Sequence, residues 1–393
     1  MTTVDRATTC TPIAGDRIGE STGDSSALVA PGHGSDDADM KSNVVYFQDL
    51  RIAGATNSDI SNALKCCLMK LSRGVYSVIR RCETRAHRRF QDFADDIAWL
   101  NYHETGRHQD REQARSYQNH LKILRIRHYP HYRPGDIVCG ISAARLHKLG
   151  MFNEPEQAVS VFHPVSSTSS AELIRRRRPI SDDDVCLVDG LRVTSAARTA
   201  LDLRAELGAG ACFAAMEQTL RRHMFGDDED EIFRIGYAPF LMDDVPEAVE
   251  EVFSSPISRL SRGRKIASAL ATYVSPLSES YAESRASLSL HLLGLHEFSQ
   301  QVEIRDGGRL LTRLDFLFRE DRVAIYVDGT QKYVDGGFDV MNKESRQHNR
   351  LLAMGYKVVR FKFNEVLEAK KFGQKLFQQV PELKSRCRER LIL

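Results

Sequence analysis

Three carboxylates in the last third of the chain are placed where they could meet. Asp315 interrupts an otherwise apolar segment that is typical of a strand, and Asp328 ends the next apolar segment. Glu283 belongs to a helix-like segment that precedes both. Because an unpaired carboxylate is costly to bury, we expect these groups to share a cation, Mg²⁺ or Mn²⁺, that would activate water for attack on a phosphate. Lys332 could bring a positive charge to the same place, although Asp328 followed by Gly329 is also typical of a simple turn.

The segments around these residues predict a mixed α/β sheet. Leu288 and Leu292 lie on one side of an amphipathic helix, and Gly355 is typical of a residue that ends a helix. A turn-forming segment, 305–308, joins two apolar segments as in a β-hairpin. We therefore expect helices over 279–292 and 343–354, and strands over 301–304, 310–317, 322–327 and 357–363.

Residues 44–81 have the outline of a winged helix-turn-helix. We expect a helix over 44–53, a second helix over 60–67 behind N-cap candidates at 56–59, and a hairpin of strands 68–71 and 75–79. In that fold the second helix enters the DNA major groove and the wing lies at the phosphate backbone. The residues placed for DNA contact are Asn57, Ser58, Asn62 and Lys65 near the helix and Arg73 on the wing. The same outline occurs in protein-interaction modules, and this helix is not rich in arginine.

The middle of the chain predicts two further regions. Residues 82–134 form a charged helical insertion, with four apolar side chains spaced for one face, Phe90, Phe93, Ile97 and Leu100. Residues 135–223 predict an α/β region in which Arg175 to Arg178 could bind phosphates or keep an edge strand soluble. The remaining expected parts are a disordered tail over 1–43, an acidic linker over 224–258 and a last domain over 259–393.

Charge is segregated along the chain, although the net charge is only +2. Residues 1–43 carry seven acidic side chains against three basic ones, which is typical of a solvated tail. Residues 65–133 carry fifteen Lys or Arg against seven Asp or Glu, and fifteen minus seven leaves an excess of eight positive charges. Such an excess favours a polyanionic partner, although a solvated helical face with charges of both signs would give the same count.

Composition excludes several classes of protein. Of the 393 residues, 42% are apolar and 27% are charged, unlike in collagen-like or wholly disordered chains. No apolar run is long enough to cross a membrane and no secretory signal is visible, so we expect a cytoplasmic protein with no membrane partner. None of the eight cysteines forms a C-x-x-C pair, so we expect reduced, mostly buried thiols rather than a metal or redox site.

Motifs in the last block resemble the Vsr-like branch of the PD-(D/E)XK nuclease superfamily. They are AESR around Glu283, LDFLF around Asp315, VAIYVDG through Asp328, and the run KESRQHNRLLAMGYKVVRF. The resemblance implies a restriction-endonuclease-like mixed sheet in which Glu283, Asp315 and Asp328 match the acidic positions. Tyr326 stands where the family pattern has Glu, and Lys332 where it has His. Because residues i and i+2 of a strand share a face, Tyr326 removes a carboxylate from beside Asp328, and weak or absent cleavage is expected.

The upstream blocks resemble the AbiEi-type antitoxin region found with such domains. LSRGVY over 71–76 is similar to its winged-helix ending, SAARLH over 142–147 to its middle helix, and VDGLRVTSAART over 188–199 to a strand with its following helix. The resemblances imply a DNA-binding regulator or antitoxin-like protein with a degenerate nuclease site, and duplex DNA and a cognate toxin as partners.

Two other functions stay open at this point. One is a metal-dependent DNA endonuclease in which Glu283, Asp315 and Asp328 hold the cation while Lys332 or Arg346 stabilises phosphate charge. The other is a protein-interaction role, with the charged helical segment 83–127 as the docking surface.

Overall fold

The computed structural model describes residues 11–12, 40–106, 111–156, 158–226, 237, 241–328 and 337–393. Among these, 139–156 and 194–393 belong to one compact unit, and those up to Val138 together with 158–193 belong to a second. Helices and strands alternate in both units, so the predicted α/β fold class is confirmed. Within the described ranges, no helix has the length and apolar character needed to cross a bilayer.

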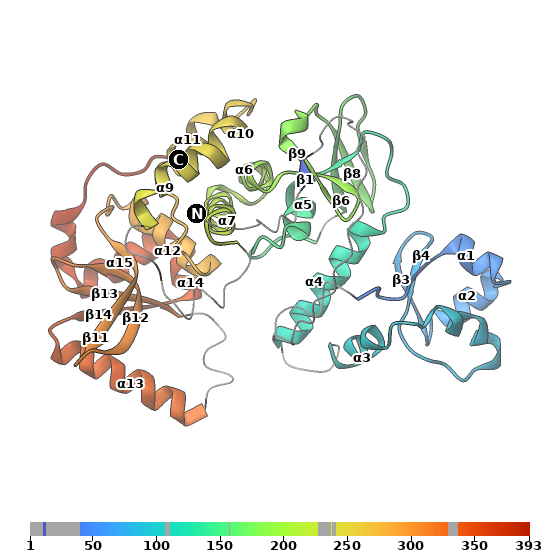
Figure 1. The fold of residues 1–393 in the computed structure, drawn as a ribbon, viewed down its shortest axis with the longest axis horizontal. Helices are drawn as coiled ribbons and strands as arrows, with labels where there is room; N and C mark the ends of the chain where they lie inside the picture. The colour runs from blue at the N-terminus through green and yellow to red at the C-terminus, as the bar shows by residue number, and fades with distance from the viewer. Residues whose placement is uncertain are drawn as a thin grey trace, which may run out of the picture. The chain divides into compact units, whose positions relative to one another are not determined.

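A three-stranded sheet with two short helices begins the second unit (Figure 1). Its strands are β2 (Val44–Tyr46), β3 (Leu68–Ser72) and β4 (Val75–Val78) in the order β2-β4-β3, and all pairs are antiparallel. The helices α1 (Phe47–Ile52) and α2 (Asn57–Ala63) lie between β2 and β3 in the chain. The predicted helix over 44–53 is therefore wrong at its start, where three residues pair with β4 instead. The predicted helix over 60–67 is shifted toward the N-terminus, because Thr56 is its N-cap.

The expected disordered tail over 1–43 lies largely outside the described residues. Residues Thr11–Pro12 form strand β1, which pairs with a strand of the second unit described below. Ser42 and Asn43 are buried, and the carbonyl oxygen of Ser42 accepts a hydrogen bond from Ser77 Oγ at 2.7 Å. The folded part therefore begins before residue 44.

The predicted helical insertion forms three helical segments. They are a 3-10 helix, Arg85–Phe93, and the α-helices α3 (Ile97–Gly106) and α4 (Arg111–Arg127). Phe90 and Trp99 are fully buried, and the Trp99 indole nitrogen donates to Ser77 Oγ at 2.9 Å. Ile97, however, is exposed, so the predicted single apolar face is wrong at that position. Trp99, two residues after Ile97, takes the buried place because its indole finds a hydrogen-bond partner.

A seven-stranded sheet completes the second unit, in the order β1-β9-β10-β5-β6-β8-β7. Its strands besides β1 are β5 (Ile137–Val138), β6 (Val159–His163), β7 (Thr168–Ser169), β8 (Leu173–Arg177), β9 (Val185–Val188) and β10 (Leu191–Thr194). Arg175 is buried in it and makes two hydrogen bonds to the carboxylate of Asp136, at 2.6 and 2.7 Å. This arginine of the basic quartet is therefore structural.

Helices form the start of the first unit. They are α5 (Gly140–Leu146), α6 (Ala196–Leu207), α7 (Ala209–Phe225), α9 (Val245–Val249), a π-helical turn (Glu250–Ser254), α10 (Ser255–Ser258) and α11 (Arg264–Ala271). The predicted linker over 224–258 is wrong for its second half, because Val245, Ala248, Phe253 and Ile257 are buried in the core of these helices. Apolar residues three to five apart form the buried face there, and acidic residues cover the exposed face.

A four-stranded mixed sheet lies in the last third of the chain (Figure 1). Its strands are β11 (Ser299–Asp306), β12 (Arg309–Phe318), β13 (Val323–Asp328) and β14 (Lys357–Lys362), in that order, and only β13 and β14 are parallel. The flanking helices are α12 (Tyr281–Leu292), α13 (Gly337–Ala353), α14 (Phe363–Val366) and α15 (Ala369–Gln379), followed by a 3-10 helix, Pro381–Arg386.

Two apolar layers cover this sheet. On one face, side chains of α12 and α15 pack on Phe316, Ile325 and Phe361. On the other face, Leu351 of α13 packs on Leu317 and Ala324. The predicted mixed α/β sheet is confirmed. Its identity as a nuclease fold stays a prediction.

Candidate functional site

Glu283 lies in the first turn of α12, where a capping interaction fixes it. Its backbone nitrogen donates to Ser280 Oγ at 3.2 Å, and Ser280 Oγ donates back to Glu283 Oε1 at 2.8 Å. Glu283 Oε2 accepts from the backbone nitrogen of Glu279 at 2.9 Å and from Gln301 Nε2 at 2.8 Å. The carboxyl group is therefore held rigidly at the helix N-terminus.

Gln301 has an unusual backbone in the middle of strand β11. Its φ of +52° is in the left-handed region, which non-glycine residues seldom adopt. The flanking pairs Gln300↔Phe316 and Val302↔Leu314 place it opposite Asp315 of β12. Strain of this kind is kept only where the surroundings impose it, and here it accompanies the hydrogen bond from Gln301 to Glu283.

Asp315 occupies the point where strands β12 and β13 separate. The ladder between these strands ends at Phe316↔Ile325, and beyond it Asp315 Oδ2 accepts a hydrogen bond from the backbone nitrogen of Val327 at 2.6 Å. The carboxylate thus takes the place of a backbone carbonyl in the sheet. This hydrogen bond gives the half-buried aspartate a partner within an otherwise apolar strand.

Asp315 also acts on the protonation of Glu283. Burial raises the pKa of Glu283 to about 8, and the negative charge of Asp315 raises it as well. The hydrogen bonds to Glu283 act in the opposite direction but do not compensate for burial. With a pKa of about 8, Glu283 is therefore largely protonated near neutral pH.

Asp328 is paired with an arginine. Arg360 of the neighbouring parallel strand β14 donates from Nη1 to Asp328 Oδ1 at 2.8 Å. The Arg360 guanidinium lies 4.7 Å from the centre of the Tyr326 ring, and the Tyr326 hydroxyl is 2.9 Å from Thr312 Oγ1. In the ladder Tyr326 is directly opposite Arg360, so the arginine covers the face on which Tyr326 and Asp328 lie. The positive guanidinium of Arg360 therefore offsets the negative charge of Asp328 on this face.

A hydrogen bond and charge connect two pairs of the three predicted ligands. Asp315 contacts the backbone of the residue before Asp328, and its charge reaches Glu283. Among the residues that the structure describes, Glu283, Asp315 and Asp328 do not form a group whose ligand atoms are close enough to hold a metal ion.

Of the two basic residues predicted for this site, the structure describes only one. Lys332 lies outside the described residues. Arg346 lies on α13 and is exposed. One turn further on, Arg350 makes two hydrogen bonds to the carboxylate of Asp306, at 2.5 and 2.7 Å.

In the second unit, helix α2 presents a polar face. Ile60 and Ala63 are buried in the small core, so the helix turns its other side outward. The exposed residues include the four predicted for DNA contact, Asn57, Ser58, Asn62 and Lys65, the last of them in the turn after the helix. This face carries amide, hydroxyl and ammonium groups, which are donors and acceptors suited to base edges and phosphates.

The turn between β3 and β4 carries the fifth predicted residue. Arg73 is exposed there, and Gly74 has a φ of +77°, which a tight turn of this kind requires. The backbone nitrogen of Arg73 donates to Glu172 Oε1 at 3.1 Å. An exposed arginine at the tip of a hairpin is suited to contact with a phosphate backbone.

Sequence reasoning missed the partners of the predicted residues. Arg360 and Gln301 lie on strands that the sequence predicts, but which side chain faces which depends on strand register. One signal in the sequence could have indicated the contact with Arg360. Tyr326 and Asp328 are two residues apart on β13, as Arg360 and Lys362 are on β14, and the two strands are parallel neighbours.

No protein family, curated protein or solved structure matches the chain in the comparisons made with each.

Proposed function

We propose that this chain is a duplex-DNA-binding regulator, antitoxin-like in type, whose nuclease-like C-terminal sheet does not cleave. The observation that carries the proposal is that one three-stranded module has both an exposed polar face on α2 and an exposed arginine in its hairpin turn. Side chains of a helix of this kind can reach base edges in the major groove while the hairpin turn contacts the backbone.

Charge supports the proposal. The segment 65–133 carries eight more basic than acidic residues, counted as fifteen minus seven. Lys65, Lys70 and Arg73 are all exposed within it. Release of counterions from DNA phosphates would supply most of the affinity, so binding should weaken as salt rises.

Three features of the acidic site support absence of cleavage. Arg360 pairs with Asp328, Tyr326 offers no carboxylate beside it, and burial with the Asp315 charge keeps Glu283 largely protonated near neutral pH. Each feature reduces the negative charge that would attract a cation to the acidic residues. Without a bound cation, a carboxylate site of this type cannot hydrolyse a phosphodiester.

A gel-shift titration tests the DNA contact. We expect the full chain to retard a duplex at low salt and the double variant Asn62→Ala, Lys65→Ala to bind about tenfold or more weakly. Lys370→Ala, which removes one exposed lysine on α15, is the charge-matched control and should bind as the wild type does. Equal binding by the double variant and the wild type would refute this assignment of the contact.

The second candidate function is a Mg²⁺-dependent endonuclease, which is favoured by the proximity of Asp315 and Glu283. Incubation of plasmid with Mg²⁺ or Mn²⁺ distinguishes the two. We expect no nicking by either the wild type or Asp315→Ala. Nicking by the wild type that Asp315→Ala abolishes would establish the endonuclease and exclude the non-cleaving account.

A further inference from the structure

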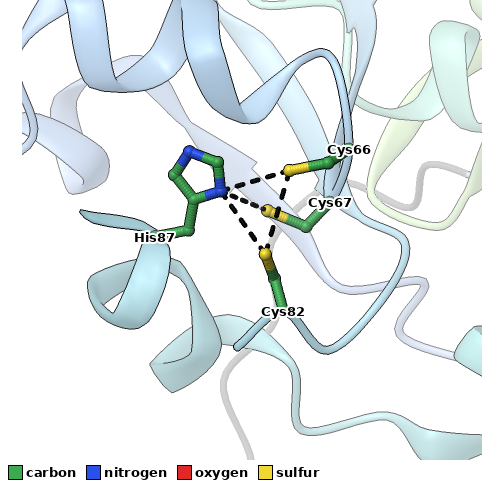
Figure 2. Close-up of side chains that lie close together, drawn as sticks. All are labelled: Cys66, Cys67, Cys82 and His87. Atoms are coloured by element: carbon green, nitrogen blue, oxygen red, sulfur yellow. Dashed lines mark hydrogen bonds between the residues drawn. The ribbon is translucent and has the colours of Figure 1, made fainter. Parts of the chain in front are cut away.

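Four side chains of the second unit, outside the sites above, converge on one point (Figure 2). Cys66 and Cys67 lie between the end of α2 and the start of β3, Cys82 follows β4, and His87 lies in the 3-10 helix Arg85–Phe93. One ligand atom from each lies within 4.8 Å of the other three. Cys67 and His87 are buried, and Cys66 and Cys82 are partly buried.

The distances suit a common centre better than hydrogen bonding. His87 Nδ1 is 3.1 Å from Cys66 Sγ, 3.4 Å from Cys82 Sγ and 3.7 Å from Cys67 Sγ. The Sγ atoms of Cys66 and Cys82 are 3.9 Å apart. A neutral imidazole nitrogen accepts one hydrogen bond, so it cannot serve three thiols at once. A tetrahedral zinc site with bonds of about 2.0 to 2.3 Å has ligand-to-ligand edges of about 3.3 to 3.8 Å.

We propose that Cys66, Cys67, Cys82 and His87 bind one zinc ion in a structural site. Three thiolates and one imidazole are a ligand set that selects zinc over magnesium, calcium or manganese, which prefer oxygen. Four protein ligands complete a tetrahedron, so no position is left for water or substrate. The site is therefore structural rather than catalytic.

The place of the site explains what the ion would stabilise. Its ligands come from the end of α2, from both ends of the β3–β4 hairpin and from the 3-10 helix that follows. The apolar core of this module is small, and small folded units often need a metal or disulfide to hold them together. The ion would join α2 to the base of the hairpin, a role that does not depend on the proposed DNA binding.

The test is to purify the full chain without chelators and to measure its metal content by inductively coupled plasma mass spectrometry. We expect about one zinc ion per chain. Cys82→Ser and His87→Ala should lose most of the metal, because each removes a ligand. Cys387→Ser is the matched control, since Cys387 is a partly buried free thiol in the other unit, and it should keep the metal.

Cobalt gives a second measurement that needs no variant. Wild-type protein stripped of metal and titrated with Co²⁺ should develop the intense absorption of a tetrahedral cobalt–thiolate centre at about one equivalent. Wild-type protein that contains no zinc and gives no such absorption would overturn the proposal, as would full zinc content in Cys82→Ser. These readouts are independent of DNA binding, so failure of one proposal is distinguishable from failure of the other.

Discussion

Glu217 of α7 shows how burial sets the charge of one residue in this protein. The side chain is fully buried, and its Oε1 accepts from the backbone nitrogen of Ser275 at 3.1 Å. Burial raises the pKa of Glu217 from 4.5 to about 8. Between these two values the folded chain keeps a proton that the unfolded chain has lost. The free energy of unfolding should therefore fall as pH rises through this range.

We expect Glu217→Gln to remove this pH dependence, because glutamine resembles the neutral carboxyl group. The wild type should lose about 1.4 kcal/mol of stability per pH unit relative to the variant between about pH 5 and about pH 8. Urea unfolding across that range measures the difference. Glu250→Gln replaces an exposed carboxylate and should leave the slope unchanged. Parallel profiles for wild type and Glu217→Gln would contradict the assigned protonation.

In the proposed non-cleaving account, Arg360 and Tyr326 prevent a cation from binding at Asp328. The double variant Tyr326→Glu, Arg360→Gln removes a positive charge and adds a carboxylate on the same face of β13. We expect Mn²⁺ binding to appear in calorimetric titration of this variant and to be absent in the wild type. Adding Asp328→Asn should abolish it again. Mn²⁺ binding by the wild type at the same strength would refute the inhibitory role of Arg360.

At the scale of elements, α2 depends on its N-terminal cap. Thr56 Oγ1 accepts from the backbone nitrogen of Asp59 at 3.1 Å, and Asp59 Oδ2 accepts from the backbone nitrogen of Thr56 at 2.9 Å. Because the helix has only seven residues, it cannot be stable without its cap and its packing. These two bonds fix the direction in which its polar face points.

We expect Thr56→Ala to destabilise the second unit by about 1 kcal/mol, since it removes an N-cap acceptor. Chemical unfolding followed by circular dichroism measures the loss. Ser61→Ala, an exposed substitution inside the same helix, should be neutral, because alanine favours helix. A loss in Ser61→Ala equal to that in Thr56→Ala would show that the cap has no special role.

Local signals predicted many elements and missed others for physical reasons. The cap at Thr56, the hairpin around Gly74 and the strands of the last sheet follow from short-range chemistry, and the structure confirms them. Val44–Tyr46 reads as helix from its neighbours, but pairing with β4, a distant contact, makes it a strand. Residues 245–258 look like a linker because acidic residues mask their apolar spacing.

The cysteine cluster was missed because its ligands have no standard spacing. Two adjacent cysteines, a third one fifteen residues after the second, and a histidine five residues further on do not match C-x-x-C patterns. They meet because the β3–β4 hairpin brings its two ends together. The acidic residues were predicted as candidates, whereas the pairing of Asp328 with Arg360 depends on strand register that sequence does not give.

On the scale of the whole molecule, the chain divides its middle region between two units. Residues 139–156 belong with 194–393, while 158–193 belong with the N-terminal part. From the sequence, 135–223 was predicted to be a single region. The chain passes from one unit to the other and back within it, and composition does not change at those points. Each unit has its own apolar core, which includes Leu203 in the first and Val78 in the second.

We expect two thermal transitions, each sensitive to its own core. Leu203→Ala should lower the transition temperature of the first unit alone, because it reduces the free energy of unfolding of that unit by about 2 to 5 kcal/mol. Val78→Ala should lower the transition temperature of the second unit alone. The decrease should be smaller, because this substitution removes fewer buried carbon atoms. Differential scanning calorimetry measures both. A single transition that both variants shift together would contradict independent units.

The most direct test of the central claim, DNA binding through α2 and the hairpin turn, is the salt dependence of binding to a fluorescent duplex. We predict that the logarithm of the association constant falls linearly with the logarithm of salt concentration, and that Arg73→Ala reduces the steepness by about one unit. Absence of binding at the lowest salt, or an affinity that salt leaves unchanged, would contradict the account.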